Sequence, residues 1–168
     1  MNTPDSSDIH HSNISEDLLP KLHSQTRGVL DGVEALLANG IEDANDRTMV
    51  SAAMAFIEHP TEHLPDIILH TGNIGMVLVG YDMQGADIPP EIDAMNAYLL
   101  TLQCINRIKF IEGWHDKSTT SSPDTQQIPR QTIDLTMEFA LSEAAVLSRQ
   151  YKDNTLNDAL NELKDRIA

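Results

Sequence analysis

The chain has little of three things on which many proteins depend: cysteine, aromatic residues and positive charge. Its 168 residues include one cysteine, Cys104, so no disulfide can form within the chain. Aromatic residues make up only 4% of the sequence, and aliphatic side chains, alanine and seven methionines must therefore fill the core. The length suits one domain with one hydrophobic core.

Positive charge is scarce, with 11 Lys and Arg residues against 26 Asp and Glu residues and a net charge of −15. Nucleic-acid binding through a basic patch is excluded, because it requires clustered Lys and Arg side chains. Attraction to an anionic membrane surface is excluded for the same reason. The charge favours solubility and would draw the protein toward a basic partner.

Long hydrophobic runs are also missing. The longest apolar stretch, residues 67–79, is shorter than the about 20 residues that a membrane-spanning helix needs. The first residues have neither the basic segment nor the apolar segment of a signal peptide. We therefore expect a cytoplasmic protein with no membrane association.

Helical periodicity is the main pattern that the sequence does contain. Apolar side chains recur three and four residues apart in several segments, which predicts an all-α fold. The expected arrangement is a single-domain bundle of five to six helices over residues 15–168. A disordered, flexible tail (1–14) precedes the bundle, and a polar flexible linker (116–128) lies before the last two helices.

Proline and glycine residues suggest where these helices begin and end. The first helix is expected to start near Pro20 and to end at Gly40, with Gly40 as a left-handed cap. The second should run from about Asn45 to Glu58. The fourth should open at Pro89-Pro90 and end at Gly113, and the last two should start near Pro129 and Thr155.

The third segment, residues 65–84, is ambiguous because it contains three glycines and the strand-like run MVLVGYD at 76–82. Pro65 and Asp66 suit the start of a helix, and we predict a helix here. Ile68, Gly72, Gly75 and Val79 would then share one face. Because glycines let another backbone approach closely, we name Gly72, Gly75 and Val79 as candidate partner or oligomer contacts.

The fifth helix contains a heptad seam. Ile133, Met137, Ala140, Ala144, Leu147 and Tyr151 follow a 4-3-4-3-4 spacing. Such a seam can close the bundle or pair with a second chain. Met137, Ala140 and Ala144 are therefore further candidate interface residues.

Residues 59–63 read His-Pro-Thr-Glu-His, which has the spacing of the inverted zinc-protease signature. That site needs both histidines on one continuous helix. Pro60 disfavours helical geometry at His59, and Pro65 would break a helix that began at Pro60. We therefore interpret these residues as a corner between two helices.

Two other histidine patterns stand close together in the sequence. Glu112 and His115 have the E-x-x-H spacing of di-iron bundles, but such a site needs two of these motifs, and the chain contains one, with a glycine inside it. The neighbouring pair His115-Asp116 resembles the doublet of the HD phosphohydrolases, an all-helical family that binds metal. The family's metal site also uses an upstream His and a downstream Asp, for which the resemblance implies His70 and Asp134. The alternative metal site that we name consists of His63, His70, His115 and Asp116. Cys104 has no His or acid one turn away and is expected to be a buried filler.

No coherent catalytic set emerges from these motifs, and no cofactor is implied. The sequence favours a non-enzymatic, acidic protein–protein interaction module, such as a chaperone, an adaptor, or an inhibitor or immunity-type binder. The expected partner is another protein, and the acidic charge would favour one with a basic surface. A homo-oligomer is the other option. The alternative is a metal-dependent hydrolase of an HD-like all-helical type.

Overall fold

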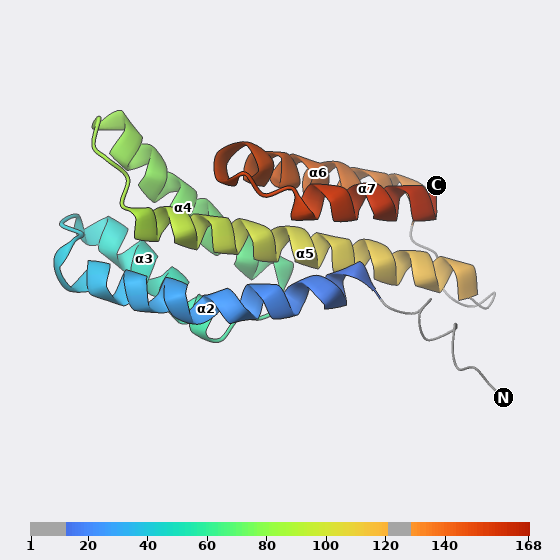
Figure 1. Cartoon of the computed structure of the whole chain (residues 1–168), viewed down its shortest axis with the longest axis horizontal. Helices are drawn as coiled ribbons and strands as arrows, with labels where there is room; N and C mark the ends of the chain where they lie inside the picture. Colours follow the sequence, from blue (N-terminus) through green and yellow to red (C-terminus); the bar gives the residue numbers. More distant parts are fainter. Residues whose placement is uncertain (1–12, 121–128) are drawn as a thin grey trace. The chain divides into compact units, whose positions relative to one another are not determined.

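The computed structural model describes residues 13–120 and 129–168, which form six helices and, within those ranges, no strand (Figure 1). The prediction of an all-α fold is thereby confirmed. The helices are α2 (Ile14–Asn39), α3 (Ala44–Glu58), α4 (Leu64–Met83), α5 (Pro90–Thr120), α6 (Arg130–Tyr151) and α7 (Thr155–Ile167). Residues 1–12 of the predicted tail and 121–128 of the predicted linker lie outside the described residues.

The chain divides into two compact units. The terminal unit is built from both ends of the chain, Met1–Lys21 and Cys104–Ala168, and the central unit consists of Leu22–Gln103. The long helices α2 and α5 each contribute residues to both units.

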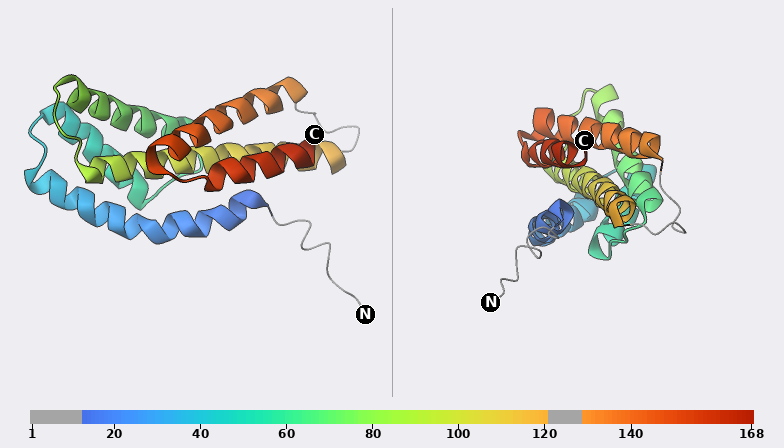
Figure 2. Two further views of the ribbon diagram at one scale, coloured as in Figure 1. Left: turned by 45° about the horizontal axis from the view of Figure 1, so that its top comes forward. Right: turned by 90° about the vertical axis from the view of Figure 1, so that its right-hand side faces the viewer.

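In the central unit, α3 and α4 lie side by side after the chain turns at residues 59–63 (Figure 2). The carboxylate of Asp43 caps α3 by accepting a hydrogen bond from the Asp46 backbone N–H at 3.0 Å. Pro65 lies in the first turn of α4, where a missing N–H costs nothing. The helix predicted for this segment is therefore confirmed, and the strand alternative is wrong.

In the terminal unit, α6 and α7 lie side by side (Figure 2). The heptad seam of α6 faces inward, and Ala140 and Ala144 are fully buried. Lys152 ends α6 in the left-handed conformation, with φ of 56°. The buried side chains of α7 are Leu156, Ala159, Leu160, Leu163 and Ile167.

Two predicted boundaries and one predicted backbone conformation are wrong. Helix α2 begins at Ile14 and contains Pro20 internally, because a carboxylate distant in sequence, Glu112, caps its first turn. Helix α5 continues through Gly113 to Thr120, and the rings of Phe110 and Trp114 stack across that glycine. Gly40 is not left-handed, since Gly85, with φ of 67°, is the glycine with positive φ among the described residues.

Candidate interaction surface

Helix α4 has apolar side chains on two opposite sides. On one side, Ile67, Ile74 and Val77 are fully buried. On the other, Leu69 is 57%, Met76 64%, Val79 56% and Met83 81% exposed. Single exposed apolar side chains are ordinary, whereas a contiguous exposed apolar patch is typical of an interaction site. Together with Gly72, these four exposed residues form what we call the α4 face.

The α4 face has the spacing of a helix-packing seam. Its five positions, Leu69, Gly72, Met76, Val79 and Met83, follow a 3-4-3-4 pattern. That repeat keeps one line of side chains facing a partner helix over about four turns. Such a line of side chains is typical of helix–helix contacts.

The glycines of α4 border open space in the part of the chain that the structure describes. A Cβ atom built on Gly72, Gly75 or Gly80 would meet nothing within 4 Å. Each glycine in a helix interior costs about 1 kcal/mol relative to alanine. Nothing within the described residues explains that cost at these positions, whereas close approach of an external backbone would.

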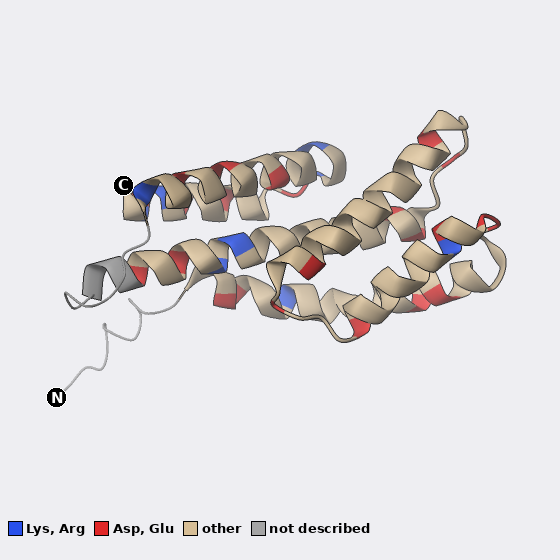
Figure 3. Ribbon diagram, turned by 180° about the vertical axis from the view of Figure 1, so that it is seen from behind, with Lys and Arg blue, Asp and Glu red and all other residues tan. Residues whose placement is uncertain are grey.

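Charge is distributed unevenly around the α4 face. The central unit contains twelve acidic and two basic residues, a net charge of −10, and residues 48–106 contain no Lys or Arg. The charged residues of α4 are Asp66 and Asp82, near its two ends, and the rest of its ribbon is tan in Figure 3. The face is thus an uncharged strip on a strongly acidic unit.

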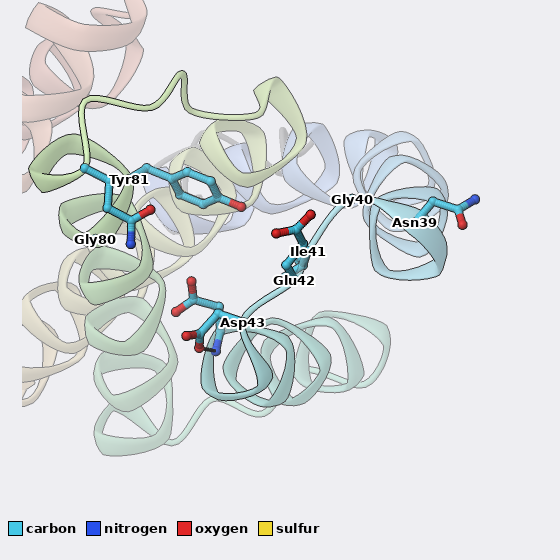
Figure 4. A pocket seen from close by; sticks show the side chains of 9 residues that line it. Asn39, Gly40, Ile41, Glu42, Asp43, Gly80 and Tyr81 are labelled. Carbon is cyan, nitrogen blue, oxygen red and sulfur yellow. Dashed lines mark hydrogen bonds between the residues drawn. The ribbon is translucent and has the colours of Figure 1, made fainter.

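A pocket of about 450 Å³ adjoins the C-terminal end of α4. Tyr81 and Gln84 of α4 line it, together with three carboxylate residues of the α2–α3 connection and the first turn of α3: Glu42, Asp43 and Asp46. Figure 4 shows the Tyr81 ring reaching from α4 toward the loop that carries Glu42.

Several carboxylates lie close together in this pocket. Burial, with the Asp43 carboxylate as a second cause, raises the pKa of Asp46. Burial also raises the pKa of Tyr81, and the charge of Asp46 adds to that increase. A cationic group placed here would relieve the repulsion.

The structure separates the two sets of predicted interface residues. Gly72 and Val79 lie on the α4 face, and Gly75 is half-buried beside it. Met137, Ala140 and Ala144 are instead buried inside the terminal unit. The α6 seam therefore closes the fold, and its three candidate residues are not available to a partner.

The residues of the alternative metal site are engaged in other ways. His63 Nδ1 lies 3.2 Å from an Asp66 carboxylate oxygen at the exposed start of α4. The ring of His70 stacks on Phe56 of α3, with centroids 4.7 Å apart. Asp66 thus pairs with His63 and not with His70, which is one helical turn further on.

The other two residues of that set, His115 and Asp116, lie in the last part of α5. Among the described residues, no group of three or more His, Cys, Asp or Glu side chains is arranged to hold a metal ion. The metal-dependent alternative therefore lacks the cluster that it requires in this part of the chain.

Glu112, half of the E-x-x-H pattern, has a structural role. Its side chain is fully buried and accepts hydrogen bonds from the Ile14 and Ser15 backbone N–H groups, at 2.7 and 3.2 Å, and from the Ser15 hydroxyl at 2.7 Å. Arg166 of α7 donates a further bond to it at 3.3 Å. One carboxylate therefore joins α2, α5 and α7 within the terminal unit.

A second buried carboxylate, Glu143 of α6, accepts a hydrogen bond from Arg107 Nε of α5 at 2.9 Å. The Arg107 guanidinium lies 5.1 Å from the centroid of the Phe139 ring. Cys104 is fully buried nearby, as predicted, and burial raises the pKa of its thiol; Glu143 adds to that increase and Arg107 opposes it.

An exposed apolar patch also occurs on the terminal unit. Leu135 is 52% and Phe139 51% exposed on α6. This patch is shorter than the α4 face, and the Arg107 guanidinium lies over the Phe139 ring.

The sequence pattern missed Leu69, Met76 and Met83. The sequence does contain the signal, because these three residues follow a 3-4-3-4 spacing together with Gly72 and Val79. Helix α4 is apolar on nearly every side, however, so periodicity could not tell which line of residues faces α3. The sequence pattern also did not predict that Glu112 and Glu143 are buried, because their hydrogen-bond partners are distant in sequence.

Comparison with known proteins finds no matching family model, no matching curated protein and no matching solved structure. Within the described residues, none of the helices combines the length and the apolar character needed to cross a membrane.

Proposed function

We propose that this protein is a non-enzymatic interaction module that binds a partner protein through the α4 face. One observation carries the proposal: an uncharged apolar helix face, more than half exposed at four side chains, on an otherwise acidic unit. Leaving such a face in water is unfavourable by roughly 25 cal/mol for each Å² of apolar surface. Binding to a partner would recover that free energy.

Glycine placement supports the same function. Two glycines within or beside the face, Gly72 and Gly75, leave open space outside the helix. A partner could therefore pack close to the α4 backbone. An acidic chaperone, an adaptor and an inhibitor of a basic protein are all compatible with this surface.

The test compares two pairs of apolar-to-polar substitutions in the full chain. Met76→Gln with Val79→Gln alters the α4 face, and Leu135→Gln with Phe139→Gln alters the exposed patch of α6 as a matched control. Each variant serves as bait in native lysate, with retained proteins identified by mass spectrometry. We expect a protein retained by the wild type and by the α6 control to be lost from the α4 variant.

Retention of the same partner by the α4 variant would reject this surface. If no protein is retained and light scattering shows a monomer over a wide concentration range, the interaction function itself is rejected. Circular dichroism of each variant establishes that a loss of binding does not reflect unfolding.

A further inference from the structure

The α4 face and the glycines beside it are placed symmetrically about Met76. Leu69 and Met83 each stand seven residues from Met76. Gly72 and Gly80 each stand four residues from it. In a helix, the two members of each pair therefore lie at equal heights above and below Met76 and at equal angles to its two sides. The layout of the face is thus the same in both directions along the helix.

Such a layout fits a second copy of the same helix that runs in the opposite direction. With a twofold axis at Met76, Leu69 of one copy lies level with Met83 of the other, and the two Met76 side chains meet. The same axis brings Val79 of one copy beside Gly72 of the other, where an added Cβ atom would meet nothing within 4 Å. A branched side chain thereby fills the open position that a glycine leaves, as close packing of two helices requires.

The twofold contact also accounts for a second glycine. Gly80 of one copy lies level with Gly72 of the other, because each stands four residues from the axis. Both positions border open space, although glycine lowers the stability of a helix interior. One axis at Met76 gives both glycines the same role, whereas a partner of unrelated sequence would leave their symmetry unexplained.

Charge on α4 permits this arrangement in one direction. The charged residues of α4 are Asp66 and Asp82, and its ribbon is tan between them (Figure 3). Parallel pairing would place each of these carboxylates level with its own copy. Antiparallel pairing about Met76 places the two Asp82 residues about 18 Å apart along the helix axis and the two Asp66 residues about 30 Å apart. Both separations exceed the about 10 Å over which charges act at about 0.1 M salt.

The unlike ends of the two helices also meet without a clash of charge. Asp82 of one copy comes near the end of α4 at which Asp66 of the other copy stands. At about 100° per residue, however, these two residues lie on opposite sides of the line of contact through Met76. The negative C-terminal end of each α4 lies near the positive N-terminal end of the other, which is an attractive arrangement.

We infer that two copies of this chain associate through the α4 face, in an antiparallel and twofold-symmetric contact centred on Met76. This inference rests on the proposed function and names the partner as a second copy. All of α4 belongs to the central unit, so the contact is built from one unit of each copy.

The size of the α4 face sets the strength of the contact. From Leu69 to Met83 it extends over about 21 Å of helix axis, and a helix is about 10 Å across. A contact of this footprint falls below the about 1,200 Å² that stable complexes bury in total. The dimer is therefore reversible, with a dissociation constant on the order of 10–100 μM.

Salt separates a second copy from a basic partner. The net charge of −15 opposes the approach of two copies at long range, and salt screens that repulsion. Raising the salt concentration from about 0.05 M to about 0.5 M should therefore strengthen the dimer at least about twofold. Binding of a basic partner would instead weaken, because salt screens its attraction to the acidic chain.

The first test reverses charge at the axis in the full-length chain. Met76→Glu and Met76→Lys each place two like charges against each other and should weaken the dimer at least about tenfold. An equimolar mixture of the two variants should restore a dimer, because opposite charges then meet. Leu135→Glu, on the exposed patch of α6, is the matched control and should leave dimerisation unchanged.

Sedimentation velocity from about 1 μM to about 1 mM measures the association over a range that brackets the expected dissociation constant. Circular dichroism establishes that each variant is folded.

The second test determines the direction of the two helices. Leu69→Cys and Met83→Cys are each treated with a short bifunctional thiol reagent, alone and as a mixture. The mixture should cross-link at least about fivefold more than either variant alone, because Leu69 and Met83 lie level in the antiparallel contact. The wild type is the control, since its Cys104 is fully buried.

The inference is overturned if the wild type stays monomeric over this concentration range, if salt weakens the dimer, or if mixing the two Met76 variants restores no dimer. Equal weakening by Leu135→Glu, or cross-linking of Leu69→Cys alone that equals the mixture, also overturns it.

The proposed function has a separate outcome. If a lysate protein is lost from Met76→Gln with Val79→Gln, the α4 face binds a different protein, and the proposed function stands without a dimer. A monomer that retains no lysate protein rejects both.

Discussion

The two units of the chain bury different kinds of residue. Within the described residues, the terminal unit encloses two carboxylates, Glu112 and Glu143, each hydrogen-bonded to an arginine. The central unit buries no charged side chain and carries its twelve acidic residues outside its core. It also leaves the α4 face uncovered.

The two units therefore differ in what specifies their helix contacts. Buried ion pairs fix which helices meet, because removing either partner leaves a charge in a poorly solvated place. The terminal unit thus has its helix contacts specified from within. The central unit keeps apolar surface available on one helix, and its acidic surroundings oppose association with another acidic chain.

The largest effect is expected at Glu112. Glu112→Ala removes the acceptor for the Ile14 and Ser15 N–H groups and leaves Arg166 without this carboxylate. The free energy of unfolding should fall by about 3 kcal/mol. The melting temperature should then fall by roughly 6–12 °C, measured by circular dichroism.

Glu34→Ala is the matched control, an exposed acidic residue of α2 in the central unit. It should change the free energy of unfolding by less than about 0.5 kcal/mol. The buried Cys104 thiol gives a local readout in the terminal unit, where Glu112→Ala should accelerate its labelling. If the two variants lost equal stability, the buried carboxylate of the terminal unit would contribute no more than an exposed acidic residue of the central unit.

The second effect concerns the buried pair of α5 and α6. Arg107→Leu leaves the Glu143 carboxylate without its guanidinium partner and should cost about 2–3 kcal/mol. Adding Glu143→Leu should recover at least about half of that loss, because no buried charge then remains. Urea denaturation of both single variants and the double variant measures the coupling.

The exposed pair His63–Asp66 of the central unit is the counterpart. His63→Ala should cost less than about 0.5 kcal/mol, since exposed ion pairs are weak. If the losses for Arg107→Leu and Glu143→Leu were simply additive, the buried pair would not act as one unit.

The third effect has the opposite sign. Gly72→Ala and Gly75→Ala should each raise the free energy of unfolding by about 0.5–1 kcal/mol, because both sites are helical and have open space for a Cβ atom. Both should weaken partner binding at the α4 face. Urea denaturation measures the stability, and retention of the partner from native lysate measures the binding.

Gly28→Ala in α2 is the control, since its Cβ atom would also meet nothing within 4 Å. It should stabilise the chain similarly and leave binding unchanged. Gly40→Ala should destabilise it, because the new Cβ atom would lie 3.1 Å from the Leu36 carbonyl oxygen. A loss of stability at Gly72 or Gly75 would mean that the α4 backbone is closely packed within the chain.

The smallest effect concerns the acidic pocket. The pKa of Asp46 is raised in the folded state, so the folded chain holds that proton to higher pH than the unfolded chain does. Its contribution to stability is therefore lost as the pH rises through the two pKa values. Asp46→Asn should raise the melting temperature at pH 7 by no more than about 1 °C. The gain should vanish near pH 3, where both states are protonated. If the rise in melting temperature were unchanged at low pH, the Asp46 charge would not be its cause.

Local chemistry was enough to predict much of the fold. Pro65 and Asp66 marked the start of α4, and the heptad spacing of α6 marked its apolar seam. The corner at residues 59–63 followed from proline geometry alone. Boundaries that depend on distant groups were missed, as at Ile14, whose N–H is capped by a residue 98 positions away.

The sequence by itself determined the helices, their apolar seams and the acidic charge, because these depend on propensities and on residues three or four positions apart. Only the tertiary structure decided which of two apolar seams is covered. The α6 seam packs inside the terminal unit, and the α4 face stays exposed. Whether a seam is buried depends on which other helices lie against it. The spacing of three and four residues defines the line of side chains on one helix, but it does not say which helices lie next to that line.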